Sequence, residues 1–369
     1  MVQQDDWFRR YKFCQPIGRG GMGVVYLAQD TQRNMAECVI KQLSSKSLTA
    51  EEVTEAIRLF SREAEILRTL DHPGIVRVFD DHATDDGNYF LVMDFVPGKN
   101  LDILIATYGP FNSEATIEIA IQCCEVLEYL HELHPPVLYR DLKPSNLMLT
   151  PDGRIVFIDF GIARTSLPQD AATRVITAGY SPPEQYFGRP ESRSDLYALG
   201  ATLFHLLTGQ RPKPISVSVP RSFEPKVMVS LDALVQRLTS HNVEERPDSA
   251  RHVRYELYHL YKEIHPEFEI PDEALVSLTM SKRSARDSKI LPRRGVISEN
   301  AVWHQGLVDE GAAGIASPDE LRNISSSRFE KLTKRQEPEP ELESVIRRRS
   351  EQPYTLWQRV KEWWTINFQ

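Results

Sequence analysis

Two stretches decide the fold: Tyr139-Arg140-Asp141-Leu142-Lys143-Pro144-Ser145-Asn146 and Asp159-Phe160-Gly161. Between them, the apolar runs 147–149 and 155–158 flank a Pro-Asp-Gly turn at 151–153. Two short β-rich runs around such a turn predict a hairpin. Because a hairpin returns the chain to where it started, its polar ends, with Asp141, Asn146 and Asp159, are expected to lie together.

The residue types at the ends of this hairpin suit the chemistry of phosphate groups. A carboxylate such as Asp141 can orient an attacking hydroxyl and accept its proton. Asn146 and Asp159 offer the hard oxygen ligands that Mg²⁺ prefers, and Lys143 can neutralise charge on a phosphoryl group in transit. A purely structural hairpin would need none of these groups in this order, so we interpret the segment as a catalytic site.

Nearer the N-terminus, glycine stands at the first, third and sixth positions of Gly18-Arg19-Gly20-Gly21-Met22-Gly23. Without a Cβ, glycines let a backbone turn approach phosphates closely. The same spacing also marks dinucleotide-binding folds, where the glycines open a helix. Here the β-type run Val24-Val25-Tyr26-Leu27 follows, so a strand–loop–strand hairpin fits better. The alternative is an ordinary glycine-rich turn.

Lys41 ends the apolar run Cys38-Val39-Ile40 and is a second candidate for phosphate binding. At the end of a strand, a lysine is usually a solvated charge. Glu63 lies on the helix predicted next and can pair with Lys41. An ammonium group held by a carboxylate grips phosphates in a fixed position.

The patterns along the chain predict two lobes. Short β-rich runs at 17–30, 37–43, 75–79 and 89–95 surround one amphipathic helix over 53–67. After Pro97-Gly98, helical patterns take over at 113–133, capped by Asn112 or Ser113, and at 194–207, with Gly209 at the C-cap. The predicted fold class is α+β, with a hinge near 95–99 and a cleft between the lobes.

The composition is that of an ordinary globular protein. Of 369 residues, 41% are hydrophobic and 26% charged, and the formal net charge is -8. These values exclude a disordered chain and argue against a nucleic-acid-binding protein, which needs a concentrated basic face. Four irregularly spaced cysteines predict reduced thiols rather than a disulfide framework or a zinc site. We find no signal peptide and no membrane span, so a soluble cytoplasmic protein is expected.

Residues from about 11 to 262 resemble the catalytic domain of the eukaryotic-like (bacterial Hanks-type) serine/threonine protein kinases. The resemblance rests on the glycine loop, the strand lysine and the two aspartate motifs. It implies a bilobal protein-kinase-like fold, with a β-rich N-lobe holding one helix and a mainly helical C-lobe. It also implies ATP and Mg²⁺, or Mn²⁺, as cofactors. The implied catalytic residues are Asp141 as the base, Lys143, and Lys41 paired with Glu63.

The same resemblance implies the remaining site residues. The nucleotide-binding residues would be Ile17, Gly18, Gly20, Gly23, Val25, Lys41, the gatekeeper Met93, and Asp94 and Val96 of the hinge. Asn146 and Asp159 would be the metal ligands. Structural support would come from Glu184 paired with Arg246, and from Asp195, which would hold the backbone of the catalytic loop.

Three positions depart from the family pattern. Tyr139 stands where histidine is usual, Val39 where alanine is common, and Pro182 where alanine precedes Pro-Glu. None of these changes removes a group that does chemistry, which disfavours the alternative of an ATP-binding pseudokinase scaffold. The other alternative, a small-molecule phosphotransferase on the same fold, is disfavoured by Ser181-Pro182-Pro183-Glu184 and by Thr177, which resemble the protein-kinase helical lobe.

The resemblance also implies which residues bind the substrate and which regulate the activity. Thr177 would contact Asp141 and Lys143 and accommodate a serine or threonine acceptor; the alternative is a merely capping threonine. Arg140 can bind a phosphate on the activation segment. Within 164–175 of that segment, we favour Thr173 as the autophosphorylation site.

The expected domains are an N-terminal extension (1–10), the catalytic domain (11–263), a low-order linker or flexible tail (264–353) and an amphipathic helix (354–369). Residues 264–369 carry 16 basic and 17 acidic side chains, so nearly all of the net charge lies in the catalytic domain. The final helix would present Leu356, Trp357, Val360, Trp363 and Trp364 on one stripe. Such a stripe suits docking on the kinase body, a partner groove or peripheral membrane contact. Expected partners are protein substrates and a second copy of the kinase, and no nucleic acid.

Overall fold

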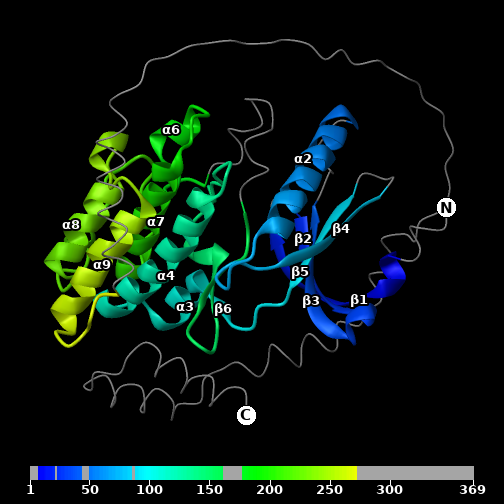
Figure 1. Ribbon diagram of the computed structural model, residues 1–369, viewed down its shortest axis with the longest axis horizontal. Helices are drawn as coiled ribbons and strands as arrows, with labels where there is room; N and C mark the ends of the chain where they lie inside the picture. The colour runs from blue at the N-terminus through cyan, green and yellow to red at the C-terminus, as the bar shows by residue number, and fades with distance from the viewer. Residues whose placement is uncertain (1–6, 21–22, 44–49, 85–87, 161–176, 272–369) are drawn as a thin grey trace. The chain divides into compact units, whose positions relative to one another are not determined.

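The computed structural model describes residues 7–20, 23–43, 50–84, 88–160 and 177–271. Its N-terminal part is a five-stranded antiparallel sheet in the order β1-β2-β3-β5-β4. The strands are β1 (Tyr11–Gly20), β2 (Gly23–Asp30), β3 (Ala36–Leu43), β4 (Val78–Ala83) and β5 (Tyr89–Asp94). Helix α2 (Ala50–Thr69) contacts β4 and β5, and Figure 1 shows it lying along the sheet.

Strand β3 decides which side chains reach the site. Successive side chains of a strand point to opposite faces. Cys38 and Ile40 are fully buried in one cluster with Tyr11 and Phe90. Val39, on the other face, packs against the larger core that is shared with the helices. Lys41 therefore lies on the same face as Val39, toward the rest of the chain.

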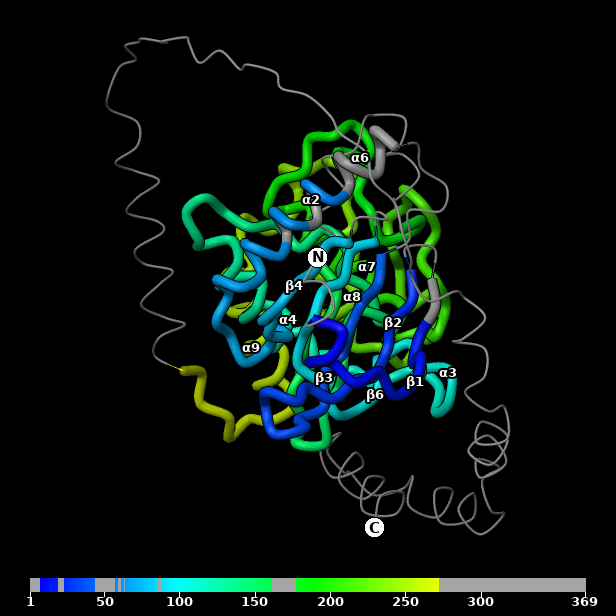
Figure 2. Tube along the Cα trace, turned by 90° about the vertical axis from the view of Figure 1, so that its right-hand side faces the viewer, coloured from blue at the N-terminus to red at the C-terminus, as the bar shows by residue number. Residues whose placement is uncertain are grey.

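Helices predominate over strands in the described chain after residue 100. They are α3 (Leu101–Tyr108), α4 (Ser113–Glu132), α6 (Pro183–Tyr186), α7 (Ser192–Thr208), α8 (Val229–Leu238) and α9 (Ala250–Ile264). Helix α4 contacts α7 and α9, and α4 and α9 lie close together in both Figure 1 and Figure 2. Helix α7 is buried from Ser194 to Leu207, so this lobe is built around it. The α+β, bilobal expectation is confirmed.

The ends of the helices follow their capping residues. Asn112 is the N-cap of α4, where its side chain accepts a hydrogen bond from the backbone N–H of Ala115. Gly209 closes α7 in the left-handed conformation, with φ of 66°, which glycine adopts at little cost. Both caps are as predicted, and of the two candidates for α4 it is Asn112 that caps.

A small sheet carries the predicted hairpin. Strands β7 (Leu147–Leu149) and β8 (Ile155–Phe157) pair antiparallel, and β6 (Lys99–Asn100) joins them at the edge of β7. The hairpin prediction from the Pro-Asp-Gly turn is therefore confirmed. Its first strand follows a short 3-10 helix, η2 (Pro144–Asn146), which belongs to the catalytic segment.

The strand predicted at 75–79 is wrong for most of its length. Strand β4 begins only at Val78 and continues to Ala83. Ile75 instead makes a single parallel bridge to Phe157, and the backbone N–H of Val76 donates to the oxygen of Phe157 at 2.9 Å. The apolar residues of this segment are thus used to connect the sheet lobe with the β8 hairpin, a long-range contact that no local pattern reports.

The predictions for the tail lie mostly outside the described residues. The linker at 264–353 is described only as far as 271, and the stripe at 354–369 is not among the described residues, so these domain bounds stay predictions. Within the part of the chain that the structure describes, no helix is long and apolar enough to cross a membrane.

Candidate active site

The carboxylate of Asp141 lies at the centre of a polar cluster. Asp141 is only 3% exposed. Thr177 Oγ1 donates to Asp141 Oδ1 at 2.8 Å, and Lys143 Nζ donates to Asp141 Oδ2 at 2.9 Å. Lys143 Nζ also donates to Thr177 Oγ1 at 3.3 Å. Asp141, Lys143 and Thr177, which the sequence predicts to act on an acceptor hydroxyl, are therefore all in contact with one another.

Asn146 is fixed by the same carboxylate. Its Nδ2 donates to the backbone oxygen of Asp141 at 2.9 Å and to Asp141 Oδ2 at 2.8 Å. Since the amide nitrogen is used in this way, the amide oxygen is the atom left for a cation. The backbone N–H of Ile158 donates to the backbone oxygen of Asn146 at 3.1 Å, which places Asp159, the next residue after Ile158, beside Asn146. Two oxygen donors of this kind fit Mg²⁺ or Mn²⁺.

Lys41 reaches across to the hairpin. Its Nζ lies 2.5 Å from Asp159 Oδ1, and the side chains of Lys41 and Asp159 are 18% and 33% exposed. The pairing predicted for Lys41 was with Glu63, which lies on α2 and whose side chain is outside the described residues. The ion pair with Asp159 was not predicted. The sequence analysis did assign both residues to the phosphates. From this common role, the proximity of Lys41 and Asp159 could have been predicted.

The glycine loop is a strand–loop–strand hairpin, as predicted. Gly18 is paired with Val25, and Gly20 with Gly23. Gly23 has φ of +144°, and a Cβ there would lie 1.8 Å from the backbone oxygen of Gln42 on β3. This glycine is therefore required by the close approach of two strands, in addition to any contact with phosphates. Ile17 is 48% exposed on the same strand as Gly18.

The predicted hinge lies at the end of β5. Met93 is buried and is paired with Val39 on β3. The backbone N–H of Asp94 donates to the oxygen of Arg77 at 2.9 Å, so any contact of Asp94 with a base would have to use its carbonyl group. The carboxylate of Asp94 pairs with Arg33 at 3.0 Å, away from that role. Val96 packs against the large core.

Asp195 holds the catalytic segment from helix α7. Its carboxylate is buried and accepts from the backbone N–H of Tyr139 at 2.9 Å and of Arg140 at 2.7 Å. His131 Nε2, near the end of α4, lies 2.8 Å from Asp195 Oδ2. The sequence analysis expected Asp195 to hold the backbone of the catalytic loop, without naming the two donors, and it missed His131. No local signal identifies His131, because it is one of several polar residues on an amphipathic helix.

Arg140 combines strain with burial. Its φ is +66°, which residues other than glycine seldom adopt, and the hydrogen bond from its backbone N–H to Asp195 compensates the cost. Its Nε is buried without a hydrogen-bond partner among the described residues. Burial lowers the pKa of the Arg140 guanidinium below its usual range, and the nearby Asp195 offsets part of this effect. The predicted partner, a phosphate on Thr173, falls in the segment 161–176, outside the described residues.

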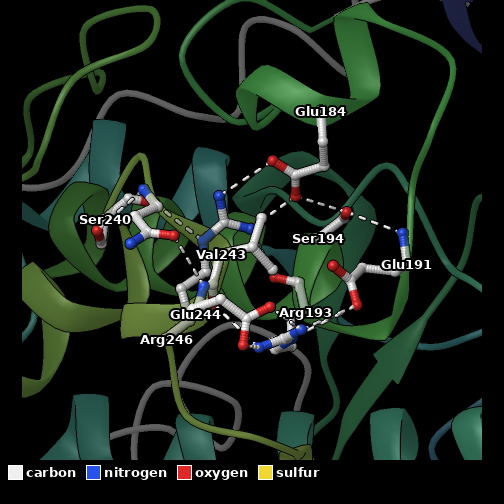
Figure 3. A network of polar contacts seen from close by, with 9 residues as sticks. Glu184, Glu191, Arg193, Ser194, Ser240, Val243, Glu244 and Arg246 are labelled. Carbon is white, nitrogen blue, oxygen red and sulfur yellow. Dashed lines mark hydrogen bonds and ion pairs between the residues drawn. The ribbon is translucent and has the colours of Figure 1, made fainter.

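Glu184 and Arg246 form the buried ion pair that Figure 3 displays. Arg246 Nη1 donates to Glu184 Oε1 at 2.6 Å and Nη2 to Oε2 at 3.1 Å, a two-point contact. Ser194 Oγ adds a bond to Glu184 Oε1 at 2.7 Å. The Arg246 side chain is 0% exposed. This pair ties α6, just after the turn that carries Thr177, to the segment between α8 and α9.

Opposing effects set the pKa of Glu184. Burial raises it, but the hydrogen bonds from Arg246 and Ser194 outweigh burial, so the pKa lies below its ordinary 4.5. A carboxyl group whose pKa is lower in the folded than in the unfolded protein stabilises the fold fully above about pH 4.5. That stabilisation is lost as the pH falls through the lower, folded-state pKa.

We expect Glu184→Gln to destabilise the fold by about 3 kcal/mol or more at pH 7, because it leaves the buried Arg246 without a countercharge. The difference from wild type should narrow as the pH falls below about 4.5 and disappear below the lower, folded-state pKa of Glu184, where the native carboxyl is itself protonated. Urea unfolding of both proteins between pH 7 and pH 3 measures this. Glu244→Gln, at an exposed partner of Arg193, is the control and should change stability little. Equal stability of wild type and Glu184→Gln at pH 7 would show that the ion pair of Glu184 with Arg246 does not stabilise the fold.

Comparison with known proteins gives one consistent result. The family model described as the protein kinase domain matches residues 11–264. The serine/threonine-protein kinase PknB of Mycobacterium leprae is 32% identical over 327 residues, which cover 83% of this chain and 50% of that protein. Serine/threonine-protein kinase C of a Synechocystis species is 33% identical over 259 residues, covering 65% and 48%.

Solved structures agree with the sequence matches. The crystal structure of the Mycobacterium tuberculosis PknI kinase domain superposes with a TM-score of 0.56 at 28% identity, covering 67% of this chain and 95% of that one. The chain spans about half the length of the curated relatives that it matches. With the match over residues 11–264, the chain belongs to the protein kinase family.

Proposed function

We propose that this chain transfers the γ-phosphoryl group of ATP to serine and threonine hydroxyls of protein substrates, as an enzyme of intracellular signalling. The observation that carries the proposal is the cluster in which Thr177 and Lys143 both contact the Asp141 carboxylate. This carboxylate accepts from the Thr177 hydroxyl at 2.8 Å, which is the kind of hydrogen bond that the hydroxyl of an acceptor would make with it. The family supports the same reaction, since protein kinases generally use ATP and a divalent metal ion.

In the proposed reaction, the acceptor oxygen forms a bond to the γ-phosphorus of ATP. The bond from that phosphorus to the β–γ bridging oxygen breaks, and ADP leaves with the electron pair. Asp141 orients the hydroxyl and takes up its proton. Lys143, held 2.9 Å from Asp141 Oδ2, offsets negative charge on the phosphoryl group during transfer.

Lys41, Asn146 and Asp159 would handle the phosphates. We propose that Lys41 binds the α- and β-phosphates, exchanging its contact with Asp159 for them. Asn146 and Asp159 would hold Mg²⁺, or Mn²⁺ in its place, and a divalent ion there supplies charge neutralisation to the phosphates. For the base, the proposed contacts are Ile17, Val25, Met93 and Val96 as the apolar residues, with backbone groups of Asp94 and Val96.

Asp141→Ala should lower the rate of phosphoryl transfer by at least about 10²- to 10⁴-fold, because the acceptor loses its general base. Lys41→Met should also lower the rate while leaving the fold intact, since Lys41 is partly exposed. Transfer from labelled ATP to generic protein acceptors and to small-molecule hydroxyl compounds is the measurement, and Lys262→Met, on the exposed side of α9, is the control. Wild-type rates in both variants would contradict the proposal. An inactive wild type would favour a pseudokinase, and transfer to small molecules alone would favour the other alternative.

We further propose that Thr173 is phosphorylated by a second copy of the kinase and that its phosphate binds Arg140. The phosphate would carry nearly two negative charges and could pair with the guanidinium of Arg140, whose Nε has no hydrogen-bond partner among the described residues. After incubation with ATP, peptide mapping should find phosphate on Thr173, and the rate per molecule should rise with protein concentration. Asp141→Ala should leave Thr173 unmodified. A Thr173 peptide free of phosphate in an active preparation would show that another residue is used.

For the C-terminal stripe at 354–369 we propose docking onto the chain's own kinase domain, in a cytoplasmic protein. The unpaired state of all four cysteines supports a reducing compartment. In flotation with vesicles containing anionic lipid, the full chain should therefore stay in the dense fraction. Co-flotation that is lost in a Trp363→Ala, Trp364→Ala double variant would instead establish membrane contact. The same chain ending at residue 353 is the control.

A further inference from the structure

The loop after α7 touches the turn that begins at Thr177. Gly179 has φ of +91°, and a Cβ on it would lie 2.2 Å from the backbone oxygen of Pro212. The turn is held by bonds from the backbone N–H groups of Tyr180 and Ser181 to the oxygen of Thr177, at 3.1 and 3.2 Å. Since Thr177 Oγ1 contacts Asp141 at 2.8 Å, this loop borders the place where the acceptor is proposed to bind.

The number of residues between Thr177 and Gly179 limits the distance between the acceptor and the loop that carries Pro212. Thr177 and Gly179 are two residues apart, so their Cα atoms are separated by at most about 7 Å, and Pro212 lies just beyond. An extended substrate advances about 3.3–3.6 Å per residue. The long side chain of Arg211, next to Pro212, can therefore reach substrate residues about two to four positions from the acceptor.

The loop after α7 carries a net positive charge next to the proposed acceptor site. The Arg211 side chain is 80% exposed, and its ion pair with Asp102 on α3 is 3.9 Å long. Charge-assisted hydrogen bonds are about 2.7–2.9 Å long, so the guanidinium keeps donors for another carboxylate. Lys213, two residues further, is exposed as well. Asp102 offsets one of these two cations, which leaves an excess positive charge.

The groups beneath this surface do not reverse its sign. Tyr180 and His205 are buried, and the Tyr180 hydroxyl lies 2.7 Å from His205 Nδ1. Burial lowers the pKa of His205 below 6.5; Asp102 raises it and Arg211 lowers it. Burial also raises the pKa of Tyr180. Both side chains are therefore neutral near pH 7 and add no negative charge under Arg211.

We propose that Arg211 binds the carboxylate of an aspartate or glutamate in the protein substrate, a few residues from the acceptor hydroxyl. The inference rests on the proposed function and adds a substrate class to it: acceptor sites flanked by acidic residues. A guanidinium suits this task because its planar donors match a carboxylate. Arg211 is a specificity residue; the transfer itself stays with Asp141 and Lys143.

The test uses the full chain and four peptides with one threonine in an alanine–glycine background. One peptide carries glutamate at positions two to four on the N-terminal side and one on the C-terminal side; the other two carry glutamine there. Wild type should show a higher kcat/KM for one glutamate peptide than for its glutamine match. Arg211→Ala should reduce this ratio by about two- to fivefold, as expected for an exposed ion pair, and Arg211→Glu should reduce it further. Lys262→Glu, with the same change of charge on α9, should keep the wild-type ratio.

A second measurement separates the inference from the proposed function. The same peptides with valine in place of threonine, labelled for fluorescence anisotropy, report binding without transfer. Glutamate-dependent binding that Arg211→Glu removes supports the inference even if no peptide is phosphorylated, and in that case the proposed function fails. A wild type that binds and phosphorylates glutamate and glutamine peptides equally overturns the inference. So does a preference that Arg211→Glu leaves unchanged. Thermal unfolding of each variant checks that the fold is kept, as the exposure of Arg211 predicts.

Discussion

The buried carboxylate of Asp195 is the constraint on which the site depends. Asp195 lies in the first turn of α7, where the free backbone groups are N–H donors, so only a side chain there can accept from the donors of the segment that passes over it. Asp195 does so for Tyr139 and Arg140 together. Arg140 can then hold a backbone conformation that costs about 1–3 kcal/mol in an unsupported chain. That conformation turns the chain so that the next residue, Asp141, meets Asn146, Lys143 and Thr177.

Two contacts that join the lobes differ from each other in strength. Val76 is joined to Phe157 through the backbone, whereas Lys41 is joined to Asp159 through a hydrogen-bonded ion pair of their side chains. A backbone contact fixes two segments, but an ion pair between partly exposed groups is weak and exchangeable. Phosphates carry more negative charge than one carboxylate, so they can displace Asp159 from Lys41. The lobe connection is therefore firm at Phe157 and exchangeable where the nucleotide is proposed to bind.

Much of the fold could be predicted because its signals are local. The hairpin around Pro-Asp-Gly, the cap at Asn112 and the end of α7 at Gly209 each follow from a few adjacent residues. The strand at 75–79 could not, because Ile75 and Val76 are used by Phe157, a residue far along the chain. The same holds at the site. Residue types and spacing indicated Asp141, Asn146 and Asp159. The contact of His131 with Asp195, 64 residues away, is not predicted by any pattern in the sequence.

Gly23 carries a consequence for how such glycine loops are read. Its neighbour across the sheet, the backbone of Gln42, leaves no room for a Cβ, and this crowding exists whether or not a nucleotide is bound. A descendant of this chain that lost catalysis would still need glycine there to keep β2 against β3. The last glycine of the loop is thus a marker of the folded sheet, and it should persist in inactive relatives after the residues that act on phosphate have drifted.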